Sequence, residues 1–410
     1  MQNQYPPQGY GQQSYGQPPY PRKAIHLTPA ASSLRRPSSA RSIWHATIAP
    51  RRLCCTSRST ARTVRRSTRP SSGTVRRSTG PSPGQYGGQP APPSPGYNPN
   101  QPGPDMSREA DALRSAMKGF GTNEATLIQV LAHLDPVQMS SVRAAFNARH
   151  RRNLLTDLEK ETSGYFRYGL VALARGPLEQ DVFNLNAAIK GVGTKESVLN
   201  DVLLSRSNAD IHAIKACYQA THRRSLESDV QGDLSLKTER LFNMVLAGRR
   251  AEESAPVIPQ QIDSDVRELY GATEGRGVGC DQVTVCAILT SRSDGQIRAI
   301  SQAYQQKYHK TLSAVLEKNF SGHMEEALLF MLHAAEDRAK HDAGLLEDAM
   351  KGMGTKDELL VNRVVRIHWN RERMNQCKGA YRHFYKRDLA DRIRGETRGD
   401  YERLLVACCQ

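Results

Sequence analysis

The sequence predicts an all-α protein made of four similar units, and three observations carry this prediction. A short glycine-rich stretch occurs three times in clean form, as Met117–Thr122, Ile189–Thr194 and Met350–Thr355, and once in degraded form, as Gly275–Cys280. The first glycine of each Gly-x-Gly falls at positions 119, 191, 277 and 352, which gives spacings of 72, 86 and 75 residues. A period of this length indicates an array of repeated units. Between the glycine stretches, apolar residues follow a helical period with almost no β-type alternation.

The first 104 residues differ from the rest of the chain in composition and charge. They hold 13 Arg, one Lys and no Asp or Glu, whereas the remainder carries 43 basic and 41 acidic residues. Residues 1–21 and 81–104 are rich in Gln, Pro, Tyr and Gly, and residues 22–80 are rich in Arg, Ser and Thr. Because no apolar period is present, we expect residues 1–104 to form a disordered head.

The basic part of the head leaves several interpretations open. Its Val-Arg-Arg-Ser-Thr, at 64–68 and again at 75–79, is compatible with a phosphorylatable arm that binds RNA or anionic lipid. It is also typical of a solvated tail, and the abrupt changes of composition are what a misread exon or reading frame produces. The head therefore supplies an alternative function, an RNA-binding or scaffold protein with a nucleic acid or protein partner.

Four repeats are expected after the head. We place them at 105–176, 177–248, 262–334 and 337–410, with a linker at 249–261 that accounts for the long second spacing. Pro256 and Pro259 mark this linker. In repeat 1, the apolar period predicts five helices that begin near Ser107, Glu124, Pro136, Asn153 and Ser163.

Each clean glycine stretch follows one helix and precedes another. In repeat 1, Leu113, Ala116 and Met117 form an i, i+3, i+4 stripe. Two glycines within three residues then end the helix and turn the backbone. The closing threonine of each stretch, Thr122, Thr194 and Thr355, is expected to cap the next helix. A loop of this kind exposes carbonyl oxygens, which are ligands that calcium accepts.

A carboxylate at a fixed spacing completes each candidate calcium site. It lies 42 residues after the first glycine in repeats 1 and 2, and 44 residues after it in repeat 4. A single loop would be an ordinary glycine turn, but the recurrence of loop, spacing and carboxylate favours calcium. The predicted metal ligands are Met117, Gly119, Gly121 and Glu161 in repeat 1, Ile189, Gly191, Gly193 and Asp233 in repeat 2, and Met350, Gly352, Gly354 and Glu396 in repeat 4.

Repeat 3 is expected to have a weak or lost site at Gly277, Gly279 and Asn319. Asn319, 42 residues after Gly277, supplies a neutral oxygen instead of a charge, and Cys280 replaces the threonine. Repeat 4 keeps every part of the site. Its two extra residues can lie between helices without moving the loop or the carboxylate.

These features together resemble the annexin family. The annexin repeat combines a Met-Lys-Gly-x-Gly-Thr loop with a later acidic residue before a turn such as Thr162-Ser163-Gly164. The resemblance covers all four repeats, and the Tyr-, Gly- and Pro-containing head is similar to that of filamentous-fungal annexins. The resemblance implies four repeats of five helices each, arranged in a curved array.

The candidate ligands predict calcium-dependent binding to anionic, phosphatidylserine-like membranes. Loop carbonyls and one bidentate carboxylate give about five oxygens, and calcium takes six to eight, so a lipid phosphate can complete the site. Lys118, Lys190, Arg276 and Lys351 stand within the loops and are expected to approach lipid headgroups. If several loops lie on one face, their contributions to membrane affinity combine through avidity. We therefore expect a cytoplasmic protein that attaches reversibly to membranes, without insertion, when calcium rises, and that acts in membrane trafficking or organisation.

Other classes of protein find little support in the sequence. No nucleophile–base pair, Walker loop or H-E-x-x-H motif predicts an enzyme, and no small-molecule substrate is expected. The eight cysteines have neither metal-ligand nor disulfide-framework spacing. Neither a secretory signal nor a run of ~18 apolar residues is visible.

Overall fold

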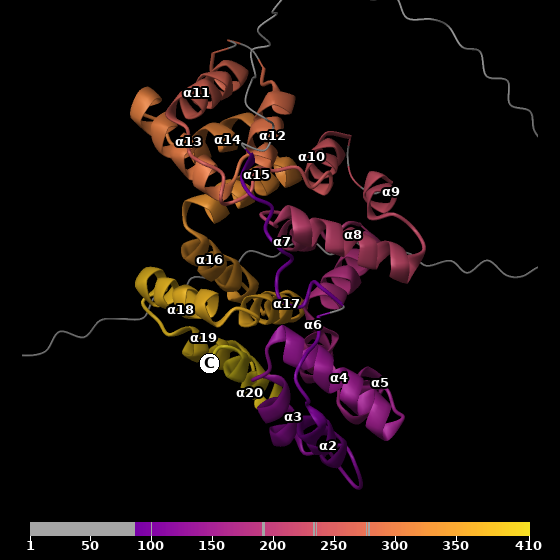
Figure 1. Cartoon of the computed structure of the whole chain (residues 1–410). Helices are drawn as coiled ribbons and strands as arrows, with labels where there is room; N and C mark the ends of the chain where they lie inside the picture. The colour runs from indigo at the N-terminus through magenta and orange to yellow at the C-terminus, as the bar shows by residue number, and fades with distance from the viewer. Residues whose placement is uncertain are drawn as a thin grey trace, which may run out of the picture. The chain divides into compact units, whose positions relative to one another are not determined.

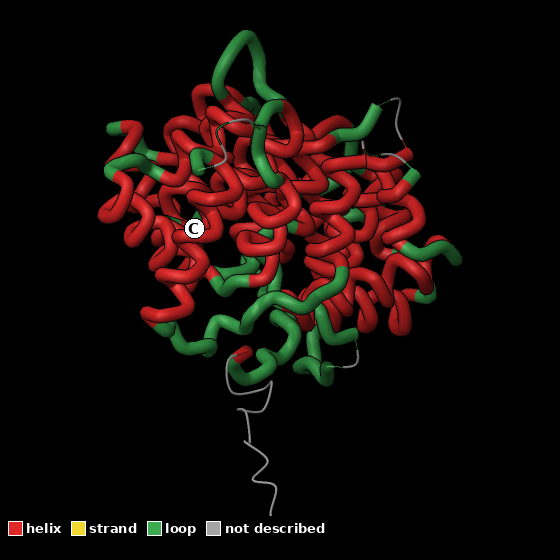
Figure 2. Tube along the Cα trace, turned by 90° about the horizontal axis from the view of Figure 1, so that it is seen from above, coloured by secondary structure: helices red, strands yellow, loops and turns green. Residues whose placement is uncertain are grey.

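The structure is a computed structural model that describes residues 87–99, 101–190, 193–232, 234, 236–275, 277 and 279–410. Within these ranges the regular structure is helical throughout, as Figures 1 and 2 show, which confirms the predicted fold class. Residues 1–86, including the basic part of the head and the alternative function attached to it, lie outside the described residues.

Each repeat contains five helices (Figure 1). Repeat 1 has α2 (Ser107–Ala116), α3 (Glu124–Leu131), α4 (Pro136–His150), α5 (Leu154–Glu161) and the first part of α6 (Gly164–Lys190). Repeat 2 has the second part of α6, α7 (Glu196–Leu203), α8 (Asn208–His222), α9 (Leu226–Gln231) and α10 (Leu236–Leu246). Repeat 3 has α11 (Pro259–Thr273), α12 (Gln282–Ser291), α13 (Asp294–Tyr308), α14 (Leu312–Asn319) and α15 (Gly322–Glu336). Repeat 4 has α16 (Arg338–Met350), α17 (Asp357–His368), α18 (Arg371–Tyr385), α19 (Leu389–Glu396) and α20 (Gly399–Cys408).

Local signals explain where these helices begin and end. The starts in repeat 1 agree with the expected ones to within one residue. Helix α4 begins with Pro136 in its first turn, behind a capping box formed by Asp135 and Gln138. The third helix of every repeat ends in a left-handed residue, because the chain reverses sharply toward the fourth helix. These residues are Arg151, Arg223, His309 and Lys386, with φ angles of 50°, 58°, 54° and 56°.

The junctions between repeats follow glycine and proline. Helix α6 is kinked at Gly176, whose φ of 75° and ψ of 171° are not helical, and Pro177 opens the part that belongs to repeat 2. The kink coincides with the expected end of repeat 1. The expected linker at 249–261 is too long at its end, since α11 already begins at Pro259. The backbone N–H groups of the first helical turn have no partner within the helix, so a proline, which lacks this N–H, fits there without loss. Pro259 therefore belongs to the first turn of α11 and not to the linker.

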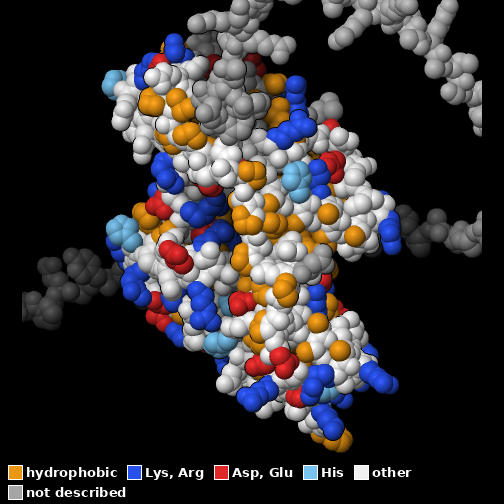
Figure 3. All heavy atoms as spheres, in the orientation of Figure 1, with side chains coloured by type: hydrophobic (Ala, Val, Ile, Leu, Met, Phe, Trp, Pro, Cys, Tyr) orange, Lys and Arg blue, Asp and Glu red, His pale blue; other side chains and the backbone are white. Residues whose placement is uncertain are grey.

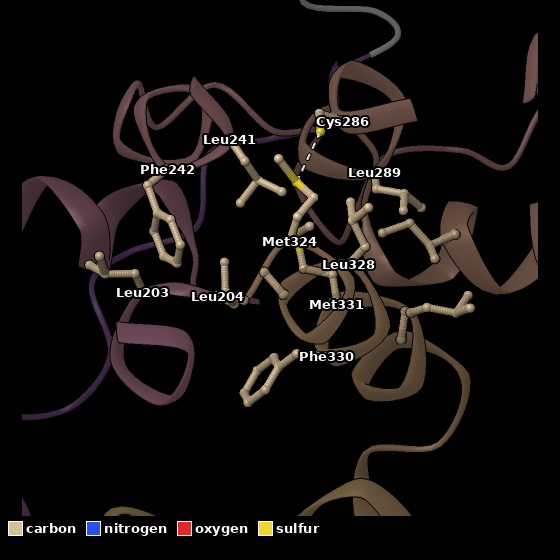
Figure 4. Close-up of a cluster of buried hydrophobic side chains, with 14 of the residues drawn as sticks. Leu203, Leu204, Leu241, Phe242, Cys286, Leu289, Met324, Leu328, Phe330 and Met331 are labelled. Carbon is tan, nitrogen blue, oxygen red and sulfur yellow. Dashed lines mark hydrogen bonds between the residues drawn. The ribbon is translucent and has the colours of Figure 1, made fainter. Parts of the chain in front are cut away.

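The four repeats share two hydrophobic cores, and the pairing does not follow chain order. One cluster of buried side chains joins repeats 2 and 3. Figure 4 shows part of it, where Cys286 of α12 lies against Met324 of α15, with 3.8 Å between the two sulfur atoms, and Phe242 of α10 lies toward Leu203 of α7. The other cluster joins repeat 1 to repeat 4. There Gly169 of α6 lies so close to α20 that an added Cβ would stand 2.7 Å from Leu404 Cδ2.

Polar side chains lie between the two cores. Arg363 of α17 donates through Nε to Asp201 of α7 at 2.8 Å, and both side chains are buried. Asn362 of the same helix accepts hydrogen bonds from Gln180 and Asn184 of α6, each at 3.2 Å. Helices α6 and α17 therefore meet through polar contacts that are satisfied within the protein.

The last part of the expected head is ordered against repeat 2. The expectation of a disordered segment up to residue 104 is wrong for residues 87–99, which run along the helices and the linker. Tyr97 is buried and its hydroxyl donates to Asp181 Oδ2 at 2.5 Å. Ser94 binds Asp210 through both its backbone N–H (2.8 Å) and its hydroxyl (2.7 Å). Single anchoring side chains, which leave no periodic pattern in the sequence, hold this extended segment.

Candidate calcium sites

The glycine loop of repeat 1 is held in an open turn between α2 and α3. The Asn123 N–H donates to the Ala116 carbonyl at 2.9 Å and closes the base of the loop. Gly119 and Gly121 have φ angles of 110° and 82°, and an added Cβ at either would meet nothing within 4 Å. Among the described residues, the carbonyls of Met117, Gly119 and Gly121 accept no hydrogen bond. Three carbonyl oxygens therefore remain available to a ligand on an open side of the molecule.

The same closing bond recurs in every repeat, from a backbone N–H just before the second helix to an alanine carbonyl at the end of the first. The bonds run from Asn123 to Ala116 (2.9 Å), from Lys195 to Ala188 (3.2 Å), from Asp281 to Ala272 (2.7 Å) and from Lys356 to Ala349 (2.9 Å). The bonded residues are seven apart in repeats 1, 2 and 4 but nine apart in repeat 3. The loop of repeat 3 is therefore two residues longer.

The threonines after the glycines do not cap the next helix. The cap of α3 is Asn123, whose side chain accepts from the Thr126 N–H, and the caps of α7 and α17 are Lys195 and Lys356. The hydroxyl of Thr122 instead donates to the backbone carbonyl of Glu161 at 3.1 Å. The loop is thereby tied to the end of α5, which brings Glu161 beside the glycines although it is 42 residues away in the chain.

The carboxylate of Glu161 is free to act as a metal ligand. It ends α5, and the following turn is fixed by Thr162, whose hydroxyl donates to the Leu158 carbonyl at 2.6 Å, and by Gly164 with a φ of 59°. In the part of the chain that the structure describes, this carboxylate makes no hydrogen bond or ion pair. Carbonyl and carboxylate oxygens are the hard donors that calcium prefers, so the donor set of repeat 1 fits calcium.

The site of repeat 2 is described in part. Gly193 has a φ of 78°, like its counterpart Gly121, and Ile189 is half-buried at the end of α6. Gly191 and Asp233, two of the predicted ligands, lie outside the described residues.

In repeat 3, Asn319 turns its side chain toward its own helix. Its Nδ2 donates to the Val315 carbonyl at 2.8 Å. Gly277 and Gly279 keep positive φ angles of 72° and 78°. The two additional residues of the loop precede these glycines, since Gly277 stands five positions after Ala272 whereas Gly119 stands three after Ala116. Close to this loop, Glu274 is paired with Lys310 (2.7 Å) and Lys318 (3.3 Å). The donor set of repeat 3 thus differs from that of repeat 1, and the weak or lost site expected here stays a prediction.

In repeat 4, loop and carboxylate come together as in repeat 1, but they have other partners. Gly352 and Gly354 have φ angles of 107° and 93°. The hydroxyl of Thr355 donates to Glu396 Oε2 at 2.7 Å, and Arg392 donates both to Glu396 and to the carbonyl of Met350. The two additional residues lie between the starts of the second and third helices, which are 12 positions apart in repeat 1 (Glu124 and Pro136) and 14 apart in repeat 4 (Asp357 and Arg371).

Comparison with known proteins accounts for this fourfold pattern. The annexin family model matches residues 108–173, 180–245, 264–331 and 341–408. The chain belongs to the annexin family. Annexins bind calcium and anionic phospholipid membranes, are generally not enzymes, and associate with membranes peripherally.

Individual annexins show how far the similarity extends. Annexin C1 of Cryptococcus neoformans var. grubii is 43% identical over 320 residues, which is 77% of this chain and 68% of that protein. Human annexin A7 is 37% identical over 305 residues, 74% of this chain and 61% of its own length. The structure of annexin III superposes with a TM-score of 0.70 at 28% identity over 77% of this chain and 97% of that one. Calcium-bound annexin (Sm)1, at 24% identity and a TM-score of 0.66, shares the fold.

The tips of two annexin loops carry large apolar side chains, which the sequence analysis overlooked. Phe120 and Met353, the middle residues of their Gly-x-Gly stretches, are fully exposed at 114% and 107% of their reference areas. The signal was present in the sequence, because an apolar residue between two glycines at a turn cannot be buried by its own loop. Single exposed apolar residues are common on proteins, but these two occupy the same position at the tips of two candidate calcium loops, and that shared position points to a binding role.

The loop cations differ in their surroundings. Lys118 and Lys190 are exposed beside their glycines, whereas Lys351 is paired with Asp348 within its own repeat. Arg276 lies outside the described residues. Lys118 and Lys190 are therefore the loop cations best placed to meet a headgroup.

A metal cluster of side chains, a disulfide bond and a membrane-spanning helix are all absent from the described part of the annexin core. No group of three or more His, Cys, Asp or Glu side chains in the described ranges could hold a metal ion. No disulfide bond joins the six described cysteines, which are Cys217, Cys280, Cys286, Cys377, Cys408 and Cys409. None of the helices in the described part of the chain combines the length and apolar character that crossing a membrane requires.

Proposed function

We propose that the protein attaches to anionic phospholipid membranes when calcium binds the glycine loops of repeats 1 and 2. The observation that carries this proposal is the repeat 1 site: its loop leaves three carbonyls unused, and Thr122 ties this loop to the end of α5, where Glu161 carries a carboxylate that is unpartnered among the described residues. Such a set is prepared for a hard cation and needs little rearrangement to bind one.

The roles of the residues follow from their positions. The carbonyl oxygens of Met117, Gly119 and Gly121 and the carboxylate of Glu161 would hold the ion in repeat 1. In repeat 2 the corresponding ligands are Ile189, Gly191, Gly193 and Asp233. When bound, calcium supplies the positive charge that a lipid phosphate oxygen needs at the open coordination positions. Thr122 positions the carboxylate, and Lys118 and Lys190 neutralise neighbouring headgroups.

The loop tips refine the expected mode of attachment. From the sequence we expect attachment without insertion, which assigns no role to Phe120 and Met353. Both side chains are nevertheless fully exposed. Once the loop lies against phosphates, its tip is at the depth of the interfacial region, where an aromatic or thioether side chain leaves water. We therefore include insertion of these two side chains in the proposal, while the helices stay outside the bilayer.

The charge of the folded core makes calcium necessary. Residues 105–410 carry 43 basic and 41 acidic residues, and Figure 3 shows both kinds interspersed on the visible face. Simple attraction of such a surface to anionic lipid is weak. A cytoplasmic protein with these sites would be recruited when calcium rises, which is the behaviour expected of a protein that acts in membrane trafficking or organisation.

Sedimentation of the full chain with vesicles tests the proposal. Phosphatidylserine vesicles should carry the protein down in calcium and much less in chelator, and pure phosphatidylcholine vesicles should not carry it down in either. The assay should be run at raised salt, because screening suppresses attraction by the 14 basic residues of the head but not bonds to a coordinated ion. Equal sedimentation in calcium and chelator at raised salt would refute the proposal.

A further inference from the structure

The guanidinium of Arg392 lies inside the candidate calcium site of repeat 4. Its Nη2 donates to the carbonyl of Met350 at 2.7 Å, and its Nη1 is paired with Glu396 Oε1. Its Nε lies 3.3 Å from Glu347 Oε2 on α16. Two of the ligands predicted for the metal, the Met350 carbonyl and the Glu396 carboxylate, are thus already bound to a positive charge from the protein.

Repeats 1 and 2 have the opposite charge at the same position. Arg392 stands four residues before Glu396, and the residues four before Glu161 and Asp233 are Asp157 and Asp229. Asp157 is paired with Arg152, with oxygen–nitrogen distances of 2.6 and 2.8 Å. No basic side chain is therefore available from this position in repeat 1, and Glu161 stays unpartnered among the described residues.

The first helix of repeat 4 is adapted to the same arrangement. Glu347, five residues before Gly352, accepts from the Tyr381 hydroxyl and faces Arg392. The corresponding residue in repeat 1, five before Gly119, is Arg114. In repeat 2 the matching tyrosine, Tyr218, donates to Asp229 on the fourth helix at 2.7 Å. The acid that binds this tyrosine is thus on the fourth helix in repeat 2 (Asp229) but on the first helix in repeat 4 (Glu347). The position of Asp229 is taken by Arg392 in repeat 4.

This arrangement differs from an ordinary surface ion pair. The side chain of Arg392 is only 13% exposed, and those of Glu347 and Glu396 are 20% and 24% exposed. An ordinary surface ion pair joins two side chains of one helix. Arg392 in addition binds the Met350 carbonyl, which belongs to another helix.

We propose that Arg392 is a built-in cation that takes the place of calcium in repeat 4. It neutralises Glu396, binds the first loop carbonyl, and keeps the loop of repeat 4 in shape without metal. This repeat is then silent to calcium and presents its exposed tip, Met353, at every calcium concentration. The inference rests on the proposed function, since it assumes that the free sites of repeats 1 and 2 take the metal.

Calcium titration of the full chain by calorimetry tests the inference. Arg392→Asp, which introduces the residue type found at this position in repeats 1 and 2, should bind one more calcium ion per chain than the parent. Arg392→Gln, which keeps length and removes charge, serves as a second variant in case the first does not fold. Arg394→Gln is the matched control, because Arg394 is exposed on the same helix and, within the described ranges, its side chain pairs only with Asp391. The control should bind as many ions as the parent.

Hydrogen exchange in chelator provides a readout that does not depend on calcium binding. The Lys356 N–H, which closes the base of the loop, should exchange severalfold faster in Arg392→Gln than in the parent or in Arg394→Gln. If neither the parent nor any variant binds calcium, the proposed function fails, and this exchange measurement alone decides the role of Arg392.

Three results would overturn the inference. The first is a crystal of the parent protein with calcium bound to Met350 and Glu396 at a concentration that also fills repeat 1. The second is a folded Arg392→Asp variant that gains no ion although the parent binds calcium. The third is unchanged exchange at Lys356 in Arg392→Gln.

Discussion

Replacing Glu161 by Gln and Asp233 by Asn removes one negative charge from each of the two free sites without changing the size of either side chain. In repeat 1 the clamp should survive, since the Thr122 hydroxyl binds the backbone carbonyl of Glu161 and not its side chain. The loop, its closing hydrogen bond and α5 should therefore keep their structure. Only the strength of the metal ligand changes.

The expected loss of affinity follows from the exposure of the Glu161 side chain. Because this carboxylate is exposed, its attraction to calcium is screened by water. At a calcium–oxygen distance of about 2.4 Å, Coulomb's law with the dielectric constant of water gives about 3.5 kcal/mol between one carboxylate charge and the doubly charged ion, which corresponds to roughly a three-hundredfold effect on binding. The remaining amide oxygen and water recover part of this loss, so we expect the calcium requirement to rise at least about tenfold.

The assay is the calcium concentration at half-maximal sedimentation with phosphatidylserine vesicles, measured for the full chain at raised salt. The matched control is Glu159→Gln, which removes the same charge from an exposed position on the same helix. Circular dichroism should show unchanged helix content in both variants. If the double variant needs no more calcium than the control, these carboxylates are not the ligands, and the calcium sites proposed for repeats 1 and 2 are wrong.

Three further predictions concern the loop tip, the ordered tail and a buried histidine. Phe120→Ser should weaken vesicle binding severalfold while leaving calcium binding in solution unchanged by calorimetry; equal loss of both would show that Phe120 supports the site and not insertion. Tyr97→Phe removes the buried hydrogen bond to Asp181 and should lower the free energy of unfolding by about 1 kcal/mol in a denaturant titration; an unchanged value would mean that residues 87–99 are held by other contacts. Burial lowers the pKa of His323 to about 4, so between about pH 6.5 and 4 the unfolded chain binds a proton that the folded chain does not, and stability falls as pH drops through this window. Thermal melts should show a weaker pH dependence for His323→Gln than for the parent; equal dependence would exclude this group.

The helical repeats and the main parts of the sites could be predicted from the sequence because their signals are local and repeated. Two glycines in three residues, followed by a helical stripe, fix a turn wherever they occur. The distance of 42 residues from Gly119 to Glu161 recurs from Gly191 to Asp233 and from Gly277 to Asn319. The sequence alone therefore showed which distant residue belongs to each loop. Helix starts depend on caps and prolines within a few residues, which explains their agreement.

What the sequence analysis missed depends on contacts between distant segments or on a single side chain. Thr122 has the sequence signature of a cap, and only the spatial position of Glu161 shows that its hydroxyl points elsewhere. Tyr97 anchors a segment with no periodic pattern, so composition alone predicted disorder. Arg392 left a readable signal, a base four residues before an acid on one helix. Its contact with the Met350 carbonyl, 42 residues earlier in the chain, required the structure.

The pairing of the first repeat with the last in one core has a consequence for biosynthesis. The N-terminal part of a protein leaves the ribosome first. Leu113, Phe146 and Leu170 therefore emerge long before Leu346, Tyr381 and Leu404, the residues of α16, α18 and α20 that share their cluster. Repeats 2 and 3 are neighbours in the chain and can complete their own core as soon as α15 is made. The nascent chain thus carries an open apolar face on repeat 1 until repeat 4 has been made, and a chain that stops after repeat 3 would keep that face exposed to chaperones and to aggregation.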